Sequence, residues 1–375
     1  MARERGGSTA DAVIIGGGII GVAAAAHLAG SGRRAVLVER SEIAAGASGR
    51  NSGVVQHPFD PVLVELHRET LQLYRQLDGL SIGQEPAGLL YVTRDVEGAR
   101  RLSAGLGAEH PGLRPAFLEP GEVRALEPSI AAGVAACRLE IGYPVAPADA
   151  THAYAALARE RGVEIRIGLA AQPWRSGARV EGVMLDDGRR IAARDVIVAA
   201  GPWSPAVVDP GGTWRPIRPI WGVVVPLTLA DPPHHVLEEA EISIEPGREP
   251  DDAGIAFSLA TAGGATGLGS TFLEDEPSAA SLVPTLIERG SGFVPAIAEA
   301  RHGQPRRCAR PQSFDGRPLI GRVPGVEGLW IAAGHGPWGI STGPASARLI
   351  ADLVSGRAGA PPAALDPGRF GPLPI

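Results

Sequence analysis

Apolar positions near the start of the chain change from the spacing of a strand to that of a helix and back. The run DAVII, residues 11–15, is short, apolar after Asp11 and rich in β-branched residues, which is typical of a strand buried on both faces. VAAAAHLAGSG, residues 22–32, is rich in alanine and predicts a helix that ends at Gly30 or Gly32. RAVLVE, residues 34–39, predicts a second strand. Together these segments predict a βαβ unit.

Three later segments continue the pattern of strands and helices. Residues 149–167, DATHAYAALARERGVEIRI, predict a helix followed by a strand. Residues 195–205, DVIVAAGPWSP, predict a buried strand that ends in a Gly-Pro turn. Residues 328–356 predict a strand, a glycine-rich loop and a helix from about Gly343. The tail rich in proline and glycine, residues 359–375, is expected to lie extended along the surface.

The middle of the chain has shorter apolar runs between turn residues. Five of them predict strands: AGLLYVT (87–93), RPIWGVVVPLTL (218–229), EISIEP (241–246), GIAFSLAT (254–261) and ATGLGSTF (265–272). Residues 279–300, AASLVPTLIERGSGFVPAIAEA, predict mostly helix.

The turn after the first predicted strand has the spacing G-x-G-x-x-G at Gly16, Gly18 and Gly21. In such a turn the first glycine permits a tight bend, the second lets the backbone approach a pyrophosphate, and the third lets the helix pack close to the strand. The helix start at Ile19 and Ile20 then directs free N–H groups and a positive dipole end at the phosphates. The motif and its flanking elements predict a dinucleotide site.

Two features beyond this turn narrow the choice of nucleotide. Glu39 ends the second predicted strand, 18 positions after Gly21, and is followed by Arg40. A carboxylate at this place accepts hydrogen bonds from ribose hydroxyls and repels a 2′-phosphate, which disfavours NADP. The loop that follows offers donors suited to a pyrophosphate and a bulky flavin, unless it is a polar surface loop: Ser48, Arg50, Asn51 and Ser52.

The composition argues against several other functions. The chain has 375 residues, enough for about two domains. Its formal net charge of −6 gives no basic surface for nucleic acid, and its basic residues are all arginine, so no lysine is available for a Schiff base. Cys137 and Cys308 form neither a disulfide framework nor a zinc pattern, so we expect no metal and a reducing cytoplasm. Three consecutive glycines interrupt the apolar run at residues 12–26, so we expect no membrane span.

A series of motifs resembles the D-amino acid oxidase-like family of FAD-dependent oxidoreductases. They are GGGIIG…VER, SGRNSGVV, YPVAPADATHAYAALARERGVEI, VIVAAGPWS, RPQSFDGRPLIG and WIAAGHGPWGISTGP, and they keep the family's order from one end of the chain to the other. The resemblance implies FAD and an α/β fold, in which a doubly wound Rossmann-like FAD-binding domain carries a second α+β substrate domain built on a mixed or antiparallel sheet. We assign the discontinuous FAD-binding domain to residues 1–80, 146–214 and 310–375, and the substrate-binding domain to residues 81–145 and 215–309.

The resemblance also implies roles for single residues. Arg310, in an Arg-Pro pair, matches the carboxylate-binding arginine of the family's amino acid oxidases; the alternative is a surface arginine in an ion pair. Cys308 matches a cysteine that the sarcosine oxidase branch bonds covalently to the flavin, although a small buried thiol explains it equally well. His335 is expected near the flavin, as a catalytic contact or as a residue that orients its loop. Further cofactor-binding positions are expected at Ala171, Gly201, Gly336, Trp338, Gly339, Ile340, Ser341 and Thr342.

These observations predict a FAD-dependent amine or amino acid oxidase or dehydrogenase. It would oxidise the C–N bond of a small amino acid or secondary amine carboxylate by hydride transfer to flavin N5. A FAD-dependent 2-hydroxy acid dehydrogenase and a flavin-carrying subunit of a multi-subunit dehydrogenase remain alternatives. The expected partners are a small-molecule substrate with a carboxylate and, as electron acceptor, O2 or another molecule. Sarcosine oxidase-like enzymes use a lysine over the flavin to promote reaction with O2, and this chain has none.

Overall fold

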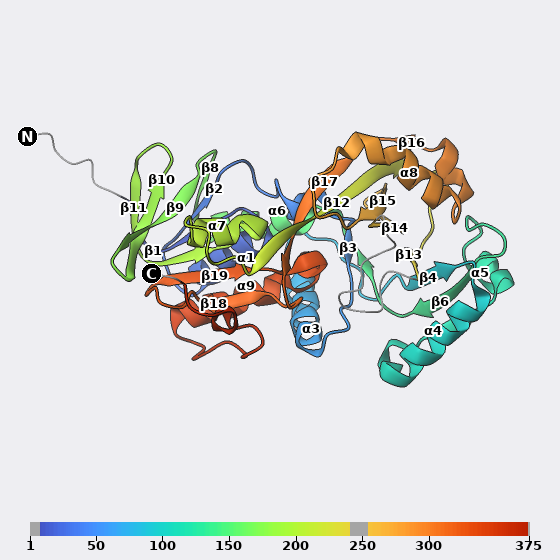
Figure 1. Ribbon diagram of the computed structural model, residues 1–375, viewed down its shortest axis with the longest axis horizontal. Coiled ribbons are helices and arrows are strands. Elements are labelled where there is room, and N and C mark those ends of the chain that lie inside the picture. The colour runs from blue at the N-terminus through green and yellow to red at the C-terminus, as the bar shows by residue number, and fades with distance from the viewer. Residues whose placement is uncertain (1–7, 241–253, 374–375) are drawn as a thin grey trace, which may run out of the picture.

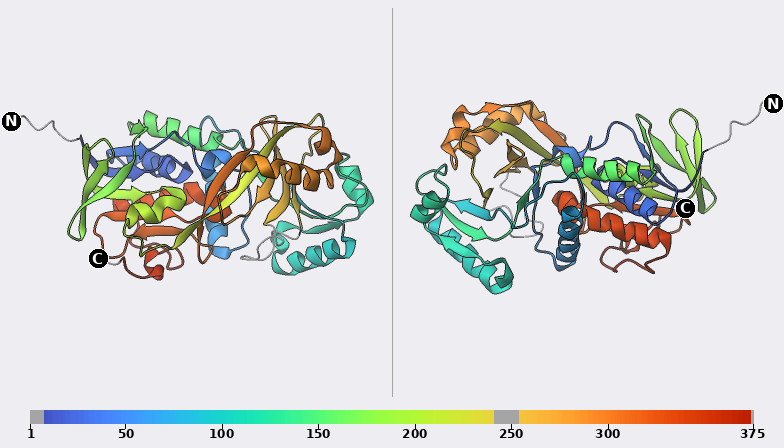
Figure 2. Two further views of the ribbon diagram at one scale, coloured as in Figure 1. Left: turned by 45° about the horizontal axis from the view of Figure 1, so that its top comes forward. Right: turned by 180° about the vertical axis from the view of Figure 1, so that it is seen from behind.

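The computed structural model describes residues 8–240 and 254–373, which form two lobes side by side (Figure 1). Both ends of the described chain lie in the first lobe, and the second lobe is made from two inserted segments (Figure 2). None of the described helices is long and apolar enough to cross a lipid bilayer.

The first lobe is built on a largely parallel sheet with the strand order β18-β19-β11-β1-β2-β8. These strands are β1 (Ser8–Ile15), β2 (Ala35–Glu39), β8 (Glu164–Ile167), β11 (Arg190–Val198), β18 (Leu319–Arg322) and β19 (Leu329–Ala333). Only β18 pairs antiparallel along this path. A hairpin of β9 (Ala171–Ser176) and β10 (Arg179–Leu185) extends from β11.

Helices pack on this sheet and confirm the predicted βαβ unit. Helix α1 (Ile19–Gly30) lies between α6 (Asp149–Glu160) and α9 (Gly339–Ser355), and α9 also packs against α3 (Pro61–Arg75). The alanines at 23–26 of α1 are fully buried, and their small side chains let the neighbouring helices approach closely. Short elements complete the lobe: α2 (Ala47–Arg50), β3 (Val54–Val55), β7 (Tyr143–Pro144), α7 (Ser204–Val208), and the 3₁₀ turns η2 (Gly201–Trp203), η4 (Gly336–Trp338) and η5 (Pro367–Phe370).

The second lobe contains the mixed sheet that the family resemblance implied. Its order is β16-β12-β15-β14-β13-β4-β6-β5, and β17 also pairs with β12. Its strands are β4 (Leu89–Thr93), β5 (Ala116–Leu118), β6 (Ala135–Leu139), β12 (Ile217–Thr228), β13 (Val236–Glu239), β14 (Ile255–Ala262), β15 (Ala265–Thr271), β16 (Arg301–His302) and β17 (Arg306–Ser313). Its helices are α4 (Val96–Glu109), α5 (Pro120–Leu126), α8 (Ala279–Ser291) and the 3₁₀ turns η1 (Pro111–Leu113) and η3 (Pro295–Glu299). The strand predicted at 241–246 lies outside the described residues.

Two long antiparallel strands connect the lobes. β12 and β17 pair in register from Ile217 opposite Ser313 to Val224 opposite Arg306 (Figure 1). The boundary that we assigned between residues 309 and 310 falls inside β17, so this strand is continuous across it. The residues that carry the predicted chemistry on β17 are therefore held by sheet hydrogen bonds rather than by a loop.

Helix α9 begins at Gly339, four residues before the predicted start, although Pro344 lies inside it. A proline within a helix has no N–H to donate to the carbonyl four residues earlier. That carbonyl belongs to Ile340, and the Tyr74 hydroxyl donates to it at 2.8 Å. A tertiary hydrogen bond thus replaces the missing helical one, and the helix starts earlier than local sequence suggests.

The expectation of an extended surface tail was wrong. The tail contains the 3₁₀ turn η5, and Leu365 and Leu373 are buried in the first lobe. The backbone N–H of Ile320 donates to the Leu365 carbonyl at 2.8 Å, which ties the tail to strand β18. Two leucines in an otherwise turn-forming sequence are therefore enough to dock it.

Candidate active site

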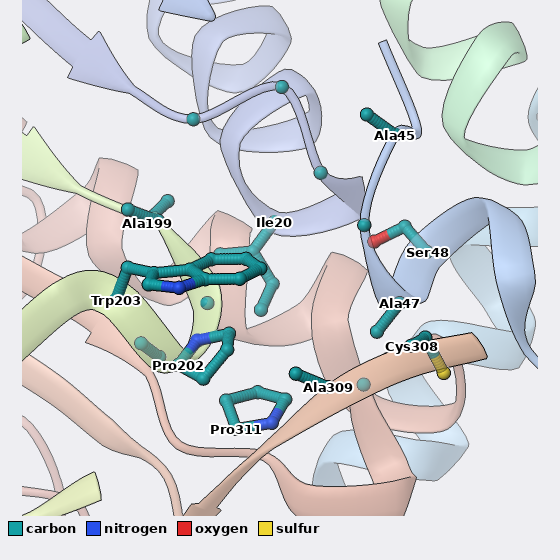
Figure 3. A pocket seen from close by; sticks show the side chains of 18 of the residues that line it. Ile20, Ala45, Ala47, Ser48, Ala199, Pro202, Trp203, Cys308, Ala309 and Pro311 are labelled. Carbon is teal, nitrogen blue, oxygen red and sulfur yellow. The ribbon is translucent and has the colours of Figure 1, made fainter. Parts of the chain in front are cut away.

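A cavity of about 800 Å³ lies at the carboxyl ends of the parallel strands and reaches β17 (Figure 3). Its wall consists of the glycine-rich turn before α1, the residues after β2, helix α2, the residues after β11, part of β17 and the loop before α9. This is the edge at which doubly wound α/β folds bind their ligands. Its size falls within the range of ordinary cofactor sites, about 300–1,000 Å³.

Gly16 and Gly21 of the first turn leave no room for a side chain. A Cβ on Gly21 would lie 1.9 Å from the Gly16 carbonyl oxygen, so no side chain fits between α1 and the turn. Gly16 itself has a φ of 120°, and a Cβ there would lie 2.4 Å from the Ala199 carbonyl oxygen. The first helical hydrogen bond of α1 is donated by Val22 to Gly18. The N–H groups of Ile19 and Ile20 precede it, at the end of the helix that faces the cavity.

The Glu39 carboxylate is fixed beside this turn. Its two oxygens accept hydrogen bonds from the backbone N–H groups of Gly17, at 2.6 Å, and Ser41, at 2.7 Å. A carboxylate has about four acceptor positions, so two remain for ribose hydroxyls. Glu39 and its neighbour Arg40 both line the cavity, which supports the predicted nucleoside end at this place.

The loop after β2 serves mainly to build the site. The Ser48 hydroxyl accepts from the Ile19 N–H at 3.0 Å, so it is engaged by α1. The Asn51 amide group donates to the carbonyls of Ala47, Ser48 and Pro147. Ser48, Arg50 and Asn51 all line the cavity, whereas Ser52 does not. The donor group of Asn51 is therefore engaged by the protein itself, whereas the Ser48 hydroxyl only accepts in this contact. Arg50 is the exposed member of the set, and it donates to the Arg307 carbonyl at 3.4 Å.

Arg310 lies on β17, where this strand lines the cavity. Its guanidinium donates to the Thr271 carbonyl at 2.7 Å and to the Ser270 hydroxyl at 2.6 Å, and it stacks 4.6 Å from the ring centre of Phe272. Gly222 of β12 leaves room for it, because a Cβ there would lie 2.5 Å from both terminal nitrogens of the guanidinium. Burial lowers the pKa of Arg310, which reflects the cost of enclosing its charge.

No carboxylate in the described part of the chain forms an ion pair with Arg310. Its recorded acceptors are a carbonyl and a hydroxyl, which carry no net charge. An enclosed cation without a counter-ion is costly unless an anion binds beside it. The alternative of a surface ion pair, which the sequence left open, therefore does not describe Arg310.

Cys308 is two residues earlier on the same face of β17, since side chains alternate along a strand. It is a free thiol with 5% of its surface exposed, and it lines the cavity. Burial raises its pKa, although Arg310, Arg50 and Arg306 act in the opposite direction. The thiol is therefore protonated at neutral pH, and its position is compatible with both the covalent bond and the simple buried thiol.

His335 lines the cavity but is only 1% exposed. Its Nε2 lies 3.0 Å from the Ser346 hydroxyl, which donates in turn to the Thr342 carbonyl at 2.9 Å. Ser346 therefore accepts from His335, which places the imidazole proton on Nε2. Burial lowers the pKa of His335 to about 3, so the ring is neutral and supplies no positive charge. This geometry favours orientation of the loop over proton transfer.

The remaining predicted residues divide into two groups. Those that line the cavity are Ala171, Gly201, Gly336, Gly339 and Ile340. Those that do not are Trp338, Ser341 and Thr342. The Ser341 hydroxyl accepts from the Gln56 N–H at 2.8 Å, and Thr342 donates to the Trp338 carbonyl, so these side chains stabilise the first turn of α9 behind the cavity wall.

Sequence reasoning missed one prominent wall residue, Trp203. Its indole is 41% exposed and projects into the cavity (Figure 3). The signal was present, because Trp203 follows the Gly-Pro turn at the carboxyl end of β11, and ligand contacts gather at such strand ends.

Comparison with known proteins agrees with this geometry. The family model for FAD dependent oxidoreductase, DAO, matches residues 11–353. A glycine oxidase of Pseudomonas aeruginosa is 30% identical over 383 residues, which cover 96% of this chain and 98% of that protein. A D-amino acid dehydrogenase of Cereibacter sphaeroides is 29% identical over 310 residues, 79% of this chain and 67% of that protein. The crystal structure of glycine oxidase from Bacillus cereus has a TM-score of 0.81 at 25% identity and covers 93% of this chain and 96% of its own.

The cavity fits the cofactor of that family. The glycine cradle that a Cβ would fill, the start of α1 and the fixed carboxylate of Glu39 are suited to the pyrophosphate and ribose of FAD. The matched segment includes both lobes and every wall of the cavity. The chain is thus a FAD-dependent oxidoreductase, and it belongs to the DAO family.

Proposed function

We propose that this enzyme oxidises the C–N bond of a small amino acid, or of a secondary amine that carries a carboxylate. The observation that carries the proposal is Arg310, an enclosed cation that lines the cavity and, among the described residues, is hydrogen-bonded only to uncharged groups. A substrate carboxylate would supply the missing counter-ion. The bound flavin supplies the acceptor for the hydride, at its N5.

The protein's part is to hold the substrate. Thr271 and Ser270 fix the guanidinium, and Phe272 covers one of its faces, so its remaining N–H donors have a defined direction. A fixed fork of this kind orients a carboxylate by two parallel hydrogen bonds. Trp221, opposite Ala309 in the sheet, lines the cavity beside Arg310 and limits the space for a side chain.

We assign no general base. Glu276 lines the cavity and is paired with Arg307 of β17 at 2.8 Å. His335 donates its one proton to Ser346. The substrate amine would therefore enter in its neutral form, and the reaction would require no proton transfer to a side chain.

The named relatives favour an amine over an alcohol as the group oxidised, because they are a glycine oxidase and a D-amino acid dehydrogenase. Those names also leave the electron acceptor as O2 or another molecule. Both cysteines are free and buried, which supports a location in the reducing cytoplasm.

The test is anaerobic reduction of the purified yellow holoenzyme. Glycine, N-methylglycine and D-alanine are compared with lactate, a hydroxy acid, and with methylamine, which lacks the carboxylate. Bleaching by the amino acids alone supports the proposal, whereas bleaching by lactate alone would establish the hydroxy acid alternative. Reoxidation by air, compared with a quinone, then separates oxidase from dehydrogenase.

A further inference from the structure

A second cavity lies in the first lobe, and it is distinct from the FAD cavity. Its volume is about 160 Å³, below the range of about 300–1,000 Å³ that is usual for organic ligands, so it suits a small ion. Among the described residues, none lines both cavities. Four arginines from separate segments line the second one: Arg33 between α1 and β2, Arg179 at the start of β10, Arg194 of β11 and Arg322 at the end of β18.

The protein neutralises the positive charge of this cavity only in part. Arg179 pairs with Glu327 at 3.2 Å, and both residues line the cavity. The other three arginines form no ion pair within the described part of the chain. The remaining acidic residue of the wall is Asp195 of β11. The wall therefore carries four positive and two negative side chains, an excess that favours an anion.

The buried Trp330 of β19 fixes two of these groups at once. Its indole N–H donates to Oδ1 of Asp195 at 2.8 Å. The central carbon of the Arg322 guanidinium, opposite Trp330 in the sheet, lies 4.7 Å from its ring centre. Asp195 is 8% exposed, and within the described chain its other carboxylate oxygen receives no hydrogen bond. A carboxylate with unused acceptor positions and a fixed guanidinium thus border the same cavity.

Asp195 and the arginines are near each other without being in contact. Burial raises the pKa of Asp195, although the indole N–H and the unpaired arginines act in the opposite direction. A ligand that donates to the carboxylate and accepts from guanidinium groups would join them. Inorganic phosphate does both, because at neutral pH it keeps at least one proton while its other oxygens accept. Sulfate keeps no proton at this pH, and a phosphate monoester loses its last one near pH 6.

We propose that this cavity binds inorganic phosphate, with the unpaired arginines donating to the phosphate oxygens and Asp195 accepting a hydrogen bond from the phosphate hydroxyl. The contact with the hydroxyl selects phosphate over sulfate, which has the same shape and can use only the arginines. It also selects free phosphate over phosphate monoesters at neutral pH. The site is separate from the proposed reaction and does not depend on it.

The test is equilibrium dialysis of the FAD-loaded holoenzyme against radioactive phosphate, at an ionic strength held constant with chloride. Phosphate should bind saturably, and sulfate and glycerol 2-phosphate should compete at least about tenfold less well than unlabelled phosphate. Arg322→Ala should weaken phosphate about 10- to 100-fold, because it removes a charge-assisted hydrogen bond. Asp195→Asn should give phosphate and sulfate similar affinities, since its amide donates to either anion while its oxygen still accepts from Trp330.

Two controls separate this cavity from other arginines of the chain. Arg34 is the neighbour of Arg33, lies 3.7 Å from Asp11 in an ion pair and lines neither cavity, so Arg34→Ala should leave phosphate affinity unchanged. Arg310→Ala should leave it unchanged as well. Loss of binding in Arg310→Ala would place the anion in the substrate cavity and overturn the proposal. It would also be overturned by absent saturable binding, by equal affinities in Arg322→Ala and Arg34→Ala, or by an unchanged preference for phosphate in Asp195→Asn.

Discussion

Replacing Arg310 should separate substrate binding from cofactor binding. Under the proposed function, the substrate carboxylate would be enclosed without a partner in Arg310→Ala, and removing one side of such a pair costs about 3–5 kcal/mol. At about 1.4 kcal/mol per tenfold, this is roughly two to four orders of magnitude in kcat/KM. Arg310→Lys should recover only part of the loss, because an ammonium cannot form the planar two-bond fork. FAD content should stay near normal, since Arg310 is held by Ser270 and Thr271 of the second lobe.

A second substitution reaches the same guanidinium without removing its charge. Gly222→Ala places a Cβ 2.5 Å from both terminal nitrogens, so the side chain of Arg310 must move. We expect a lower kcat/KM for a carboxylate substrate and little change for the matching amine without a carboxylate. Arg301→Ala, at an exposed arginine of β16, is the control and should behave like the parent enzyme. Wild-type kcat/KM in Arg310→Ala, or loss of FAD from it, would refute the assignment of the clamp.

Three further substitutions test other parts of the site. Gly21→Ala should lower FAD affinity and the melting temperature, because its Cβ would lie 1.9 Å from the Gly16 carbonyl; Gly105→Ala, in open space on α4, should lower neither. Acid denaturation should release FAD, because burial keeps Cys308 a protonated thiol, whereas flavin retained on the peptide that contains Cys308 would establish the covalent bond. Burial lowers the pKa of His335 from 6.5 to about 3. Between pH 6.5 and pH 3 the unfolded chain therefore binds a proton at this residue and the folded chain does not, so the free energy of unfolding falls as the pH is lowered through this range. His335→Asn should flatten the slope of unfolding free energy against pH by about 1.4 kcal/mol per pH unit, and an unchanged slope in urea titrations would contradict the burial argument.

The elements that the sequence predicted best are those whose cause is local. Strand β1, helix α1 and strand β2 follow from a change of apolar period and from glycines placed between them. The steric reason for Gly21 is the Gly16 carbonyl, five positions earlier, in the contact of a helix start with its own preceding turn. Gly16 is restricted in addition by the distant Ala199 carbonyl, but its place in the motif could be recognised from the spacing alone. Short-range causes of this kind can be read without knowing the rest of the fold.

Elements with distant causes were misplaced. The start of α9 depends on the hydroxyl of Tyr74, which satisfies the carbonyl that Pro344 leaves free. Asn51 looked like a cofactor donor because its partners, among them the Pro147 carbonyl, are invisible in the local sequence. A polar side chain in a loop therefore predicts that a hydrogen bond exists, but not whether protein or ligand receives it.

Arg310 could be recognised from its motif, but its role could be decided only from the structure. The Arg-Pro pair could be recognised from the sequence, yet an arginine motif is equally compatible with an ion pair. The structure decides between an ion pair and a substrate contact, because no described carboxylate pairs with Arg310. Three separate segments produce this result. β15 contributes neutral acceptors at Ser270 and Thr271, and β12 contributes space at Gly222. Glu276, which also lines the cavity, is already paired with Arg307. The anion that Arg310 requires must then come from outside the described chain, and the cavity beside it is open to a substrate carboxylate.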